Sequence, residues 1–152
     1  MQPLVTASEP ETVEAGRRLA ASLRAGDVLL LIGPLGAGKT VFARGLASGL
    51  GIDPREVHSP SYTLVTEHEP AVAGRLAMVH VDLYRIDDPG EIEELGLQDH
   101  LARDAVLVVE WGEKLPARLR AGAWRVTLEP AGGEGASADR RTIRIESPAE
   151  SH

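Results

Sequence analysis

The fold is decided by one glycine-rich stretch, Gly33-Pro34-Leu35-Gly36-Ala37-Gly38-Lys39-Thr40. It fits the pattern Gly-x-x-x-x-Gly-Lys-[Ser/Thr], in which a loop joins a strand to a helix. The apolar run before it, residues 28–32, is typical of a strand that helices cover on both faces. After it, apolar side chains recur every four residues as on one face of a helix, at Phe42, Leu46 and Leu50. A glycine turn with an unrelated lysine would not explain both neighbours.

Each residue type in this stretch suits the binding of a phosphate. Glycine has no Cβ, so the loop can turn its backbone N–H groups toward an anion, and the next helix adds its positive end. Lys39 supplies a mobile charge for the β- and γ-phosphates of a nucleotide, and the Thr40 hydroxyl can bind Mg²⁺. We expect the nucleotide to contact Gly33, Leu35, Gly36, Ala37, Gly38, Lys39, Thr40 and Val41.

Two further apolar runs, residues 76–82 and 105–110, each end in a carboxylate. In a doubly wound sheet, carboxylates at the carboxyl ends of neighbouring parallel strands face the bound ligand. We assign Asp82 to the Mg²⁺ shell and Glu110 to the γ-phosphate side, as metal partner or water-orienting base, although the exchanged roles fit equally well. The alternative is that Asp82 and Glu110 are solvent-exposed residues that cap their strands and have no chemical role. The predicted metal ligands are Thr40, Asp82 and Glu110, and the predicted catalytic residues are Lys39, Asp82 and Glu110.

The remaining segments complete an α/β pattern. A capping box at Ser8 predicts a helix that runs to Leu23 and stops at Gly26, and residues 89–101 predict a crossover helix broken near Gly96. Strict alternation over residues 124–128 and 142–145 predicts a C-terminal antiparallel hairpin. We therefore expect one P-loop NTPase domain over residues 1–152, with a doubly wound, mostly parallel sheet. Residues 130–139 are expected to form a flexible loop and residues 147–152 a disordered tail.

Composition narrows the classes of function. With 43% hydrophobic and 26% charged residues, the 152-residue chain is close to globular averages of about 45–50% and about 25%, so it is expected to fold alone. The chain has no cysteine, which excludes disulfides and thiolate metal sites. Its net charge of -7 argues against independent binding to nucleic acid. Its first residues, Met1-Gln2-Pro3, show no basic flank with an apolar run behind it, and no apolar run reaches the roughly 18 residues that a membrane span needs, so a cytoplasmic location is expected.

The histidines and aromatic residues are ambiguous. His80 lies two residues before Asp82, so both side chains point to the same face of a strand, and His80 is either a buried structural residue or part of the site. His58 and His68 are assigned to polar loops without a chemical role. Packing in the core is the favoured role of Tyr62, Tyr84 and Trp111, although each stands beside a predicted site segment.

Taken together, these segments resemble the TsaE family, small bacterial P-loop ATPases required for making threonylcarbamoyladenosine in tRNA. The combination is specific to that family and spans most of residues 8–116. Three departures, Pro34, Ser61 and Gly112, put no expected role in doubt. The matching segments are the glycine loop of residues 33–40, Ser59-Pro60-Ser61-Tyr62-Thr63-Leu64-Val65, His80-Val81-Asp82-Leu83-Tyr84-Arg85, Glu94-Leu95-Gly96-Leu97 and Glu110-Trp111-Gly112-Glu113-Lys114-Leu115-Pro116.

The resemblance implies ATP and Mg²⁺ as cofactors and an ATPase that is weak alone. It also implies an assembly with the proteins TsaD and TsaB, in which ATP hydrolysis resets the complex between rounds and TsaD transfers the threonylcarbamoyl group to tRNA. Residues 59–65 would be a switch-like loop that senses the γ-phosphate, or else a proline-containing turn entering an edge strand. By the same analogy, the helix that begins at Ser8 would lie near the adenine.

Two other functions fit the glycine loop alone. A small-molecule kinase needs a lid and an acceptor pocket, and the chain has no lid-sized insertion with clustered arginines. A binding module that requires ATP to be bound but not hydrolysed differs only in the use of Glu110.

Overall fold

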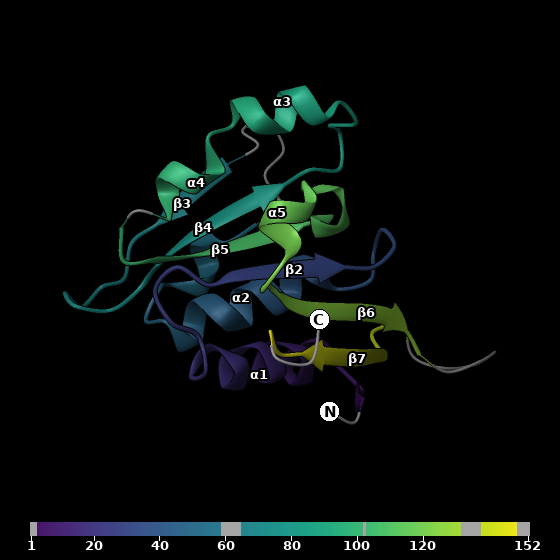
Figure 1. Ribbon diagram of the computed structural model, residues 1–152. Helices are drawn as coiled ribbons and strands as arrows, with labels where there is room; N and C mark the ends of the chain where they lie inside the picture. The colour runs from purple at the N-terminus through teal and green to yellow at the C-terminus, as the bar shows by residue number, and fades with distance from the viewer. Residues whose placement is uncertain (1–2, 59–64, 102, 132–137, 149–152) are drawn as a thin grey trace.

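The computed structural model describes residues 3–58, 65–101, 103–131 and 138–148. Most of the expected switch-like loop, the flexible loop and the tail lie outside these ranges, as does Tyr62. The described strands form one seven-stranded mixed sheet in the order β1-β7-β6-β2-β5-β4-β3 (Figure 1). Their bounds are β1 Leu4–Thr6, β2 Val28–Ile32, β3 Val65–His68, β4 Ala77–Asp82, β5 Ala105–Glu110, β6 Trp124–Pro130 and β7 Arg141–Glu146.

The centre of the sheet is parallel. β2 pairs in parallel with β5 on one side and with β6 on the other, and β5 pairs in parallel with β4. The antiparallel pairs are β3 with β4, β6 with β7 and β7 with β1. The carboxyl ends of β2, β4 and β5 consequently meet at one edge of the sheet (Figure 1). The expected doubly wound sheet with a C-terminal hairpin is confirmed.

Helices cover both faces of the sheet, which explains why the central strands are apolar except for His80 and the carboxylates that end β4 and β5. α1 (Glu9–Ala20) and α2 (Lys39–Gly49) lie on one face, over a core that contains Leu29, Leu31 and Phe42. The short helices α3 (Pro89–Glu94), α4 (Leu97–His100) and α5 (Ala117–Arg120) lie on the other face, over a second core with Leu30 and Leu107 (Figure 1). Two single 3₁₀ turns, η1 (Pro54–Glu56) and η2 (Gly112–Lys114), complete the described elements.

Glycines bring α1 and α2 into close contact. A Cβ added at Gly45 would lie 2.0 Å from the carbonyl oxygen of Val13, and one at Gly16 would lie 2.4 Å from that of Phe42. A Cβ added at Gly49 would lie 2.6 Å from the carbonyl oxygen of Arg17. Glycine lowers helix propensity by roughly 1 kcal/mol relative to alanine, but in α2 it allows the two backbones to approach. This packing holds the helix that follows the glycine loop.

Several local expectations were wrong. The first helix has Ser8 as its N-cap but ends at Ala20, so Leu23 is buried outside the helix and Gly26 begins the approach to β2. His68 belongs to the end of the edge strand β3 and is buried, not part of a polar loop. The short elements β1 and α5 were not predicted. The break at Gly96 is confirmed by its left-handed backbone, with a φ of 61°.

In the described part of the chain, no helix is both long and apolar enough to cross a membrane.

Candidate nucleotide site

The glycine loop lies between the carboxyl end of β2 and the first turn of α2. Gly36 and Gly38 have φ values of 76° and 97°, left-handed conformations that residues with a Cβ rarely adopt. Gly33 is required for another reason, because a Cβ there would lie 2.3 Å from the carbonyl oxygen of Leu128 in β6. The predicted strand, loop and helix are therefore joined as the motif requires, with Gly38 as the N-cap of α2.

Lys39 lies folded over the loop. Its Nζ donates hydrogen bonds to the carbonyl oxygens of Gly33 at 2.6 Å and Pro34 at 2.9 Å. The ammonium also lies 4.2 Å from the centroid of a Trp111 ring, within range of a cation–π interaction. Only 5% of the residue is exposed. Burial lowers the pKa of the Lys39 ammonium from its ordinary value, and the neighbouring carboxylates oppose this shift.

The Thr40 hydroxyl and the Glu110 carboxylate meet across the two elements. The Thr40 Oγ1 donates to Glu110 and lies 3.1 Å from each of its carboxylate oxygens. Glu110 ends β5 and is 3% exposed. On the same carboxylate, Oε2 lies 2.6 Å from Nε2 of His80, which is fully buried in β4. This short contact joins β4 to β5 directly behind the Thr40 hydroxyl.

Asp82 stands beside this group at the end of β4, where it is the register partner of Glu110 in the parallel pair. Its Oδ1 accepts a hydrogen bond of 2.9 Å from the backbone N–H of Tyr84. That bond closes the turn after β4. Of the two predicted carboxylates, it is Glu110 that contacts the Thr40 hydroxyl.

These groups border a cavity of about 410 Å³. Seven of the eight residues expected to contact a nucleotide line it, while Gly33 does not; the predicted carboxylates Asp82 and Glu110 line it as well. In full, the lining is Glu9, Leu35, Gly36, Ala37, Gly38, Lys39, Thr40, Val41, Asp82, Tyr84, Arg85, Glu110, Trp111 and Arg141.

The two aromatic residues at this cavity differ in how they meet the expectation of core packing. Trp111 is partly buried and packs against the second core, whereas Tyr84 is 45% exposed. Their ring centroids lie 5.1 Å apart. Trp111 has a φ of 62°, the one positive φ among the described residues other than glycine. A left-handed backbone costs a residue with a Cβ roughly 1–2 kcal/mol. This turn directs the Trp111 ring against the Lys39 ammonium.

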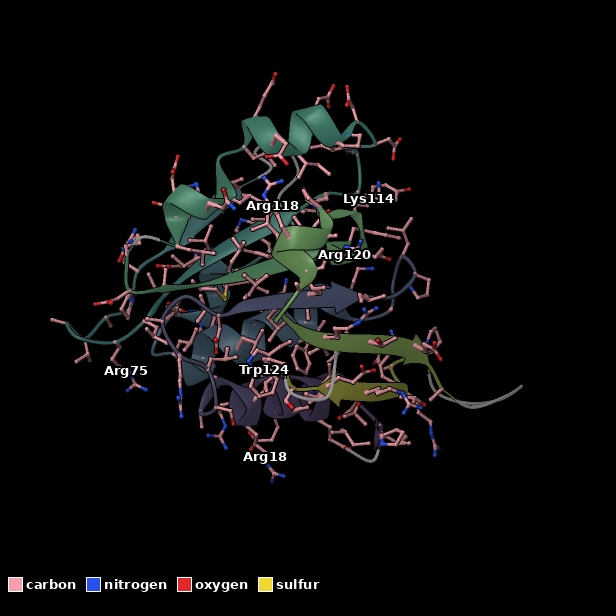
Figure 2. All side chains as sticks on the ribbon, in the orientation of Figure 1. Arg18, Arg75, Lys114, Arg118, Arg120 and Trp124 are labelled. Carbon is pink, nitrogen blue, oxygen red and sulfur yellow. The ribbon has the colours of Figure 1, made fainter. Side chains whose placement is uncertain are left out.

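Lys114 ties together the two segments that carry the carboxylates. Its Nζ donates to the carbonyl oxygens of Leu83 at 3.2 Å, Tyr84 at 2.9 Å and Ile86 at 3.1 Å, and forms an ion pair with Asp87 at 3.0 Å. Lys114 belongs to the η2 turn after β5, near α5 (Figure 2). The turn after β4 is therefore held against the turn after β5. Nothing in the sequence pattern pointed to this role.

Protein side chains alone do not form a metal centre in the described ranges, since no group of three or more histidine, aspartate or glutamate residues is placed to hold an ion. Mg²⁺ commonly takes one or two carboxylates and completes its octahedron with water and phosphate oxygens. The Thr40 hydroxyl and the Glu110 carboxylate, which meet at 3.1 Å, are donor groups of the kind that Mg²⁺ takes, and Thr40, Asp82 and Glu110 stay predicted ligands.

The sheet and the glycine loop make the chain an α/β protein of the P-loop class. Within this class, the family model described as "Threonylcarbamoyl adenosine biosynthesis protein TsaE" matches residues 6–142. Because that match covers most of the sequence, the chain belongs to the TsaE family. The expected resemblance is thereby confirmed.

Relatives agree with this assignment. A protein of Mycobacterium leprae named "tRNA threonylcarbamoyladenosine biosynthesis protein TsaE" is 46% identical over 125 residues, which are 78% of this chain and 76% of that protein. The Bacillus subtilis protein of the same name is 38% identical over 85% of this chain and 78% of its own length. The crystal structure of Bacillus subtilis YdiB superposes with a TM-score of 0.70 at 31% identity, covering 96% of this chain and 84% of the other.

Proposed function

We propose that this chain binds ATP with Mg²⁺ and hydrolyses it, and that hydrolysis drives the turnover of a tRNA threonylcarbamoyladenosine-modifying complex. The observation that carries the proposal is the contact between Thr40 and Glu110 at the glycine loop, 3.1 Å to each carboxylate oxygen. A hydroxyl and a buried carboxylate that meet beside phosphate-binding amides suit a cation bridged to phosphate oxygens.

The chain's own residues divide the work. Lys39 leaves the carbonyl oxygens of Gly33 and Pro34 and places its charge on the β- and γ-phosphates. The loop N–H groups and the start of α2 bind the phosphate oxygens. Thr40, Glu110 and Asp82 would hold Mg²⁺, which, when bound, neutralises charge that develops on the phosphates.

The contact with Thr40 favours an exchange of the roles expected for the two carboxylates. We propose that Glu110 is the carboxylate nearest the Mg²⁺ ion. Glu110 contacts the Thr40 hydroxyl, and this hydroxyl is itself a proposed ligand of the ion. Asp82, one strand further, then orients water on the γ-phosphate side. His80 holds the Glu110 carboxylate through the 2.6 Å hydrogen bond and does not contact the nucleotide.

The proposed partners are the proteins TsaD and TsaB, with tRNA bound only indirectly through them. The net charge of -7 supports indirect contact, because a phosphate backbone is bound by clustered Lys and Arg. The relatives' names supply the pathway. In this proposal the chain acts in the cytoplasm and transfers no group to tRNA itself.

The test is a reconstituted tRNA modification assay with the partner proteins, in which phosphate release is followed in parallel. We expect Glu110→Gln to lower phosphate release and repeated modification by about 100-fold or more. The matched control is Glu91→Gln, which removes the same charge from an exposed side chain in α3, away from the residues that line the cavity. We expect it to stay within about threefold of the unsubstituted protein.

Each alternative has its own outcome. If Glu110→Gln supports full repeated modification without releasing phosphate, the chain is a binding module that needs ATP bound but not hydrolysed. If labelled γ-phosphate is transferred to a metabolite and not to water, the chain is a kinase.

A further inference from the structure

Arg141, at the start of β7, reaches across to the glycine loop. Its Nε donates a hydrogen bond of 2.7 Å to the carbonyl oxygen of Ala37, and its Nη2 donates one of 2.8 Å to that of Gly36. Its Nη1 lies 2.9 Å from the carbonyl oxygen of Arg140 and 2.5 Å from that of Ala138. The guanidinium therefore joins the tip of the loop to β7, and it lines the nucleotide cavity.

These bonds matter because of the geometry of a peptide. The N–H and C=O of one peptide unit point in opposite directions, so a loop that turns its N–H groups toward a phosphate turns its carbonyl oxygens away from it. Those oxygens then need donors. Arg141 supplies donors at Gly36 and Ala37, and Lys39 supplies them at Gly33 and Pro34. The Arg141 guanidinium and the Lys39 ammonium thus each satisfy two of the carbonyl oxygens of the loop.

Lys39 and Arg141 differ in whether they can keep their hydrogen bonds to the loop when a nucleotide binds. Lys39 has to release its carbonyl oxygens to reach phosphates. Arg141 comes from β7, two strands from β2 on the side away from β5 and its carboxylate, and can keep its bonds. Its side chain also packs against Gly38, where an added Cβ would lie 3.3 Å from Nε of Arg141. The planar guanidinium of Arg141 uses two different nitrogen atoms for the two adjacent carbonyl oxygens, so both oxygens are held in one fixed geometry.

We propose that Arg141 is a positioning residue that keeps the tip of the glycine loop, Gly36 to Gly38, in its phosphate-binding shape. It acts through the loop backbone and not by contact with the nucleoside. This inference rests on the proposed binding of Mg²⁺ and ATP, and it names a residue outside the sequence motif on which that binding depends.

The experiment compares two ligands, ATP and inorganic tripolyphosphate, each with Mg²⁺, by calorimetry on the full chain. Tripolyphosphate carries the phosphates without the nucleoside, so it reports on the loop alone. We expect Arg141→Met to weaken both ligands about tenfold or more, and by the same factor within about threefold. In hydrolysis assays with the partner proteins, KM should rise by a similar factor, while kcat falls less than about threefold.

Two further variants complete the design. Arg140→Met removes the same charge from an exposed neighbouring side chain and should bind both ligands as the unsubstituted chain does. Arg141→Gln keeps one donor and should lose less affinity than Arg141→Met. It also serves if Arg141→Met proves unfolded when its circular dichroism and thermal unfolding are measured without ligand.

The results that overturn the inference are distinct. Weaker binding of ATP with unchanged binding of tripolyphosphate would show that Arg141 contacts the nucleoside instead. Unchanged binding of both ligands by folded Arg141→Met and Arg141→Gln would show that the loop does not need it. An unsubstituted chain that binds neither ligand, alone or with its partners, would instead refute the proposed function.

Discussion

The hydroxyl of Thr40 lies 3.1 Å from both carboxylate oxygens of Glu110, a residue seventy positions further along the chain. The two meet because β5 is the direct parallel neighbour of β2, with Leu31 of β2 in register with Glu110. The first turn of the helix after β2 therefore faces the end of β5. This relationship sets the first prediction.

Thr40→Val keeps the shape of the side chain and removes the hydroxyl. We expect Mg²⁺ to improve ATP binding about tenfold or more in the unsubstituted protein and less than about threefold in Thr40→Val, since one metal ligand is lost. Thr40→Ser retains the hydroxyl and should retain most of the effect. Calorimetric titration with and without Mg²⁺ measures it, and an equal Mg²⁺ effect in all three proteins would contradict the assignment of Thr40.

His80 is predicted to stabilise the site by its hydrogen bond to Glu110. Both side chains are buried, so His80→Ala leaves a cavity and a carboxylate that has lost a donor. We expect the free energy of unfolding to fall by about 2–4 kcal/mol. His80→Gln retains an N–H donor of similar reach and should lose less than about 1.5 kcal/mol. Urea denaturation measures both losses, and equal losses would mean that the hydrogen bond contributes nothing.

Lys114 is predicted to hold the turn after β4 in place. Lys114→Met removes hydrogen bonds to three carbonyl oxygens and an ion pair, and we expect a loss of about 1–3 kcal/mol in the free energy of unfolding. Amide hydrogen exchange should rise selectively at residues 83–87. Arg118→Met, which breaks an exposed ion pair with Glu93, is the control and should cost less than about 1 kcal/mol. Unaltered exchange at residues 83–87 would refute the role.

Gly45 is predicted to be essential for the packing of α2 on α1. In Gly45→Ala the new methyl group would lie 2.0 Å from a backbone oxygen, that of Val13, which only a shift of a helix can relieve. We expect a loss of about 3 kcal/mol or more, despite the better helix propensity of alanine. Gly90→Ala, whose nearest neighbour is the flexible Asp88 side chain at 3.3 Å, should change stability by less than about 1 kcal/mol. Thermal unfolding compares the two, and similar values would argue against close helix packing.

His68 is predicted to make stability depend on pH. Burial, with a smaller contribution from His80, lowers the pKa of His68 below its ordinary value of 6.5. Between those two pKa values the unfolded chain binds more protons than the folded chain, so stability falls as the pH drops below 6.5. We expect the free energy of unfolding to be up to about 1 kcal/mol lower at pH 5.5 than at pH 7.5 because of this residue.

Urea denaturation at both pH values tests this dependence. His68→Gln should show a smaller difference between the two than the unsubstituted protein. His58→Gln removes an exposed histidine that makes only the smallest contribution to the lowered pKa of His68, so it should keep most of the difference. An unchanged difference in His68→Gln would assign the pH dependence to other groups.

Much of the fold could be predicted from the sequence because its signals are local. The glycine loop, the apolar strands β2, β4 and β5 and the break at Gly96 are properties of consecutive residues, and the structure has them within a residue or two. Elements with weak local signals were missed. β1 and α5 have three and four residues, too few to show a period, and the end of α1 at Ala20 precedes Gly26 by six residues.

The order of residues along the chain is enough to identify the groups that carry the chemistry, namely a loop that has no Cβ at its turns, a lysine, a hydroxyl and two acidic strand ends. How these groups meet depends on the folded arrangement of the strands. It placed Glu110, not Asp82, against Thr40, turned Trp111 toward Lys39, and brought Arg141 and Lys114 to distant backbone carbonyl oxygens. The physical reason is that a hydrogen bond from a side chain to a remote carbonyl depends on the strand order and leaves no pattern along the chain.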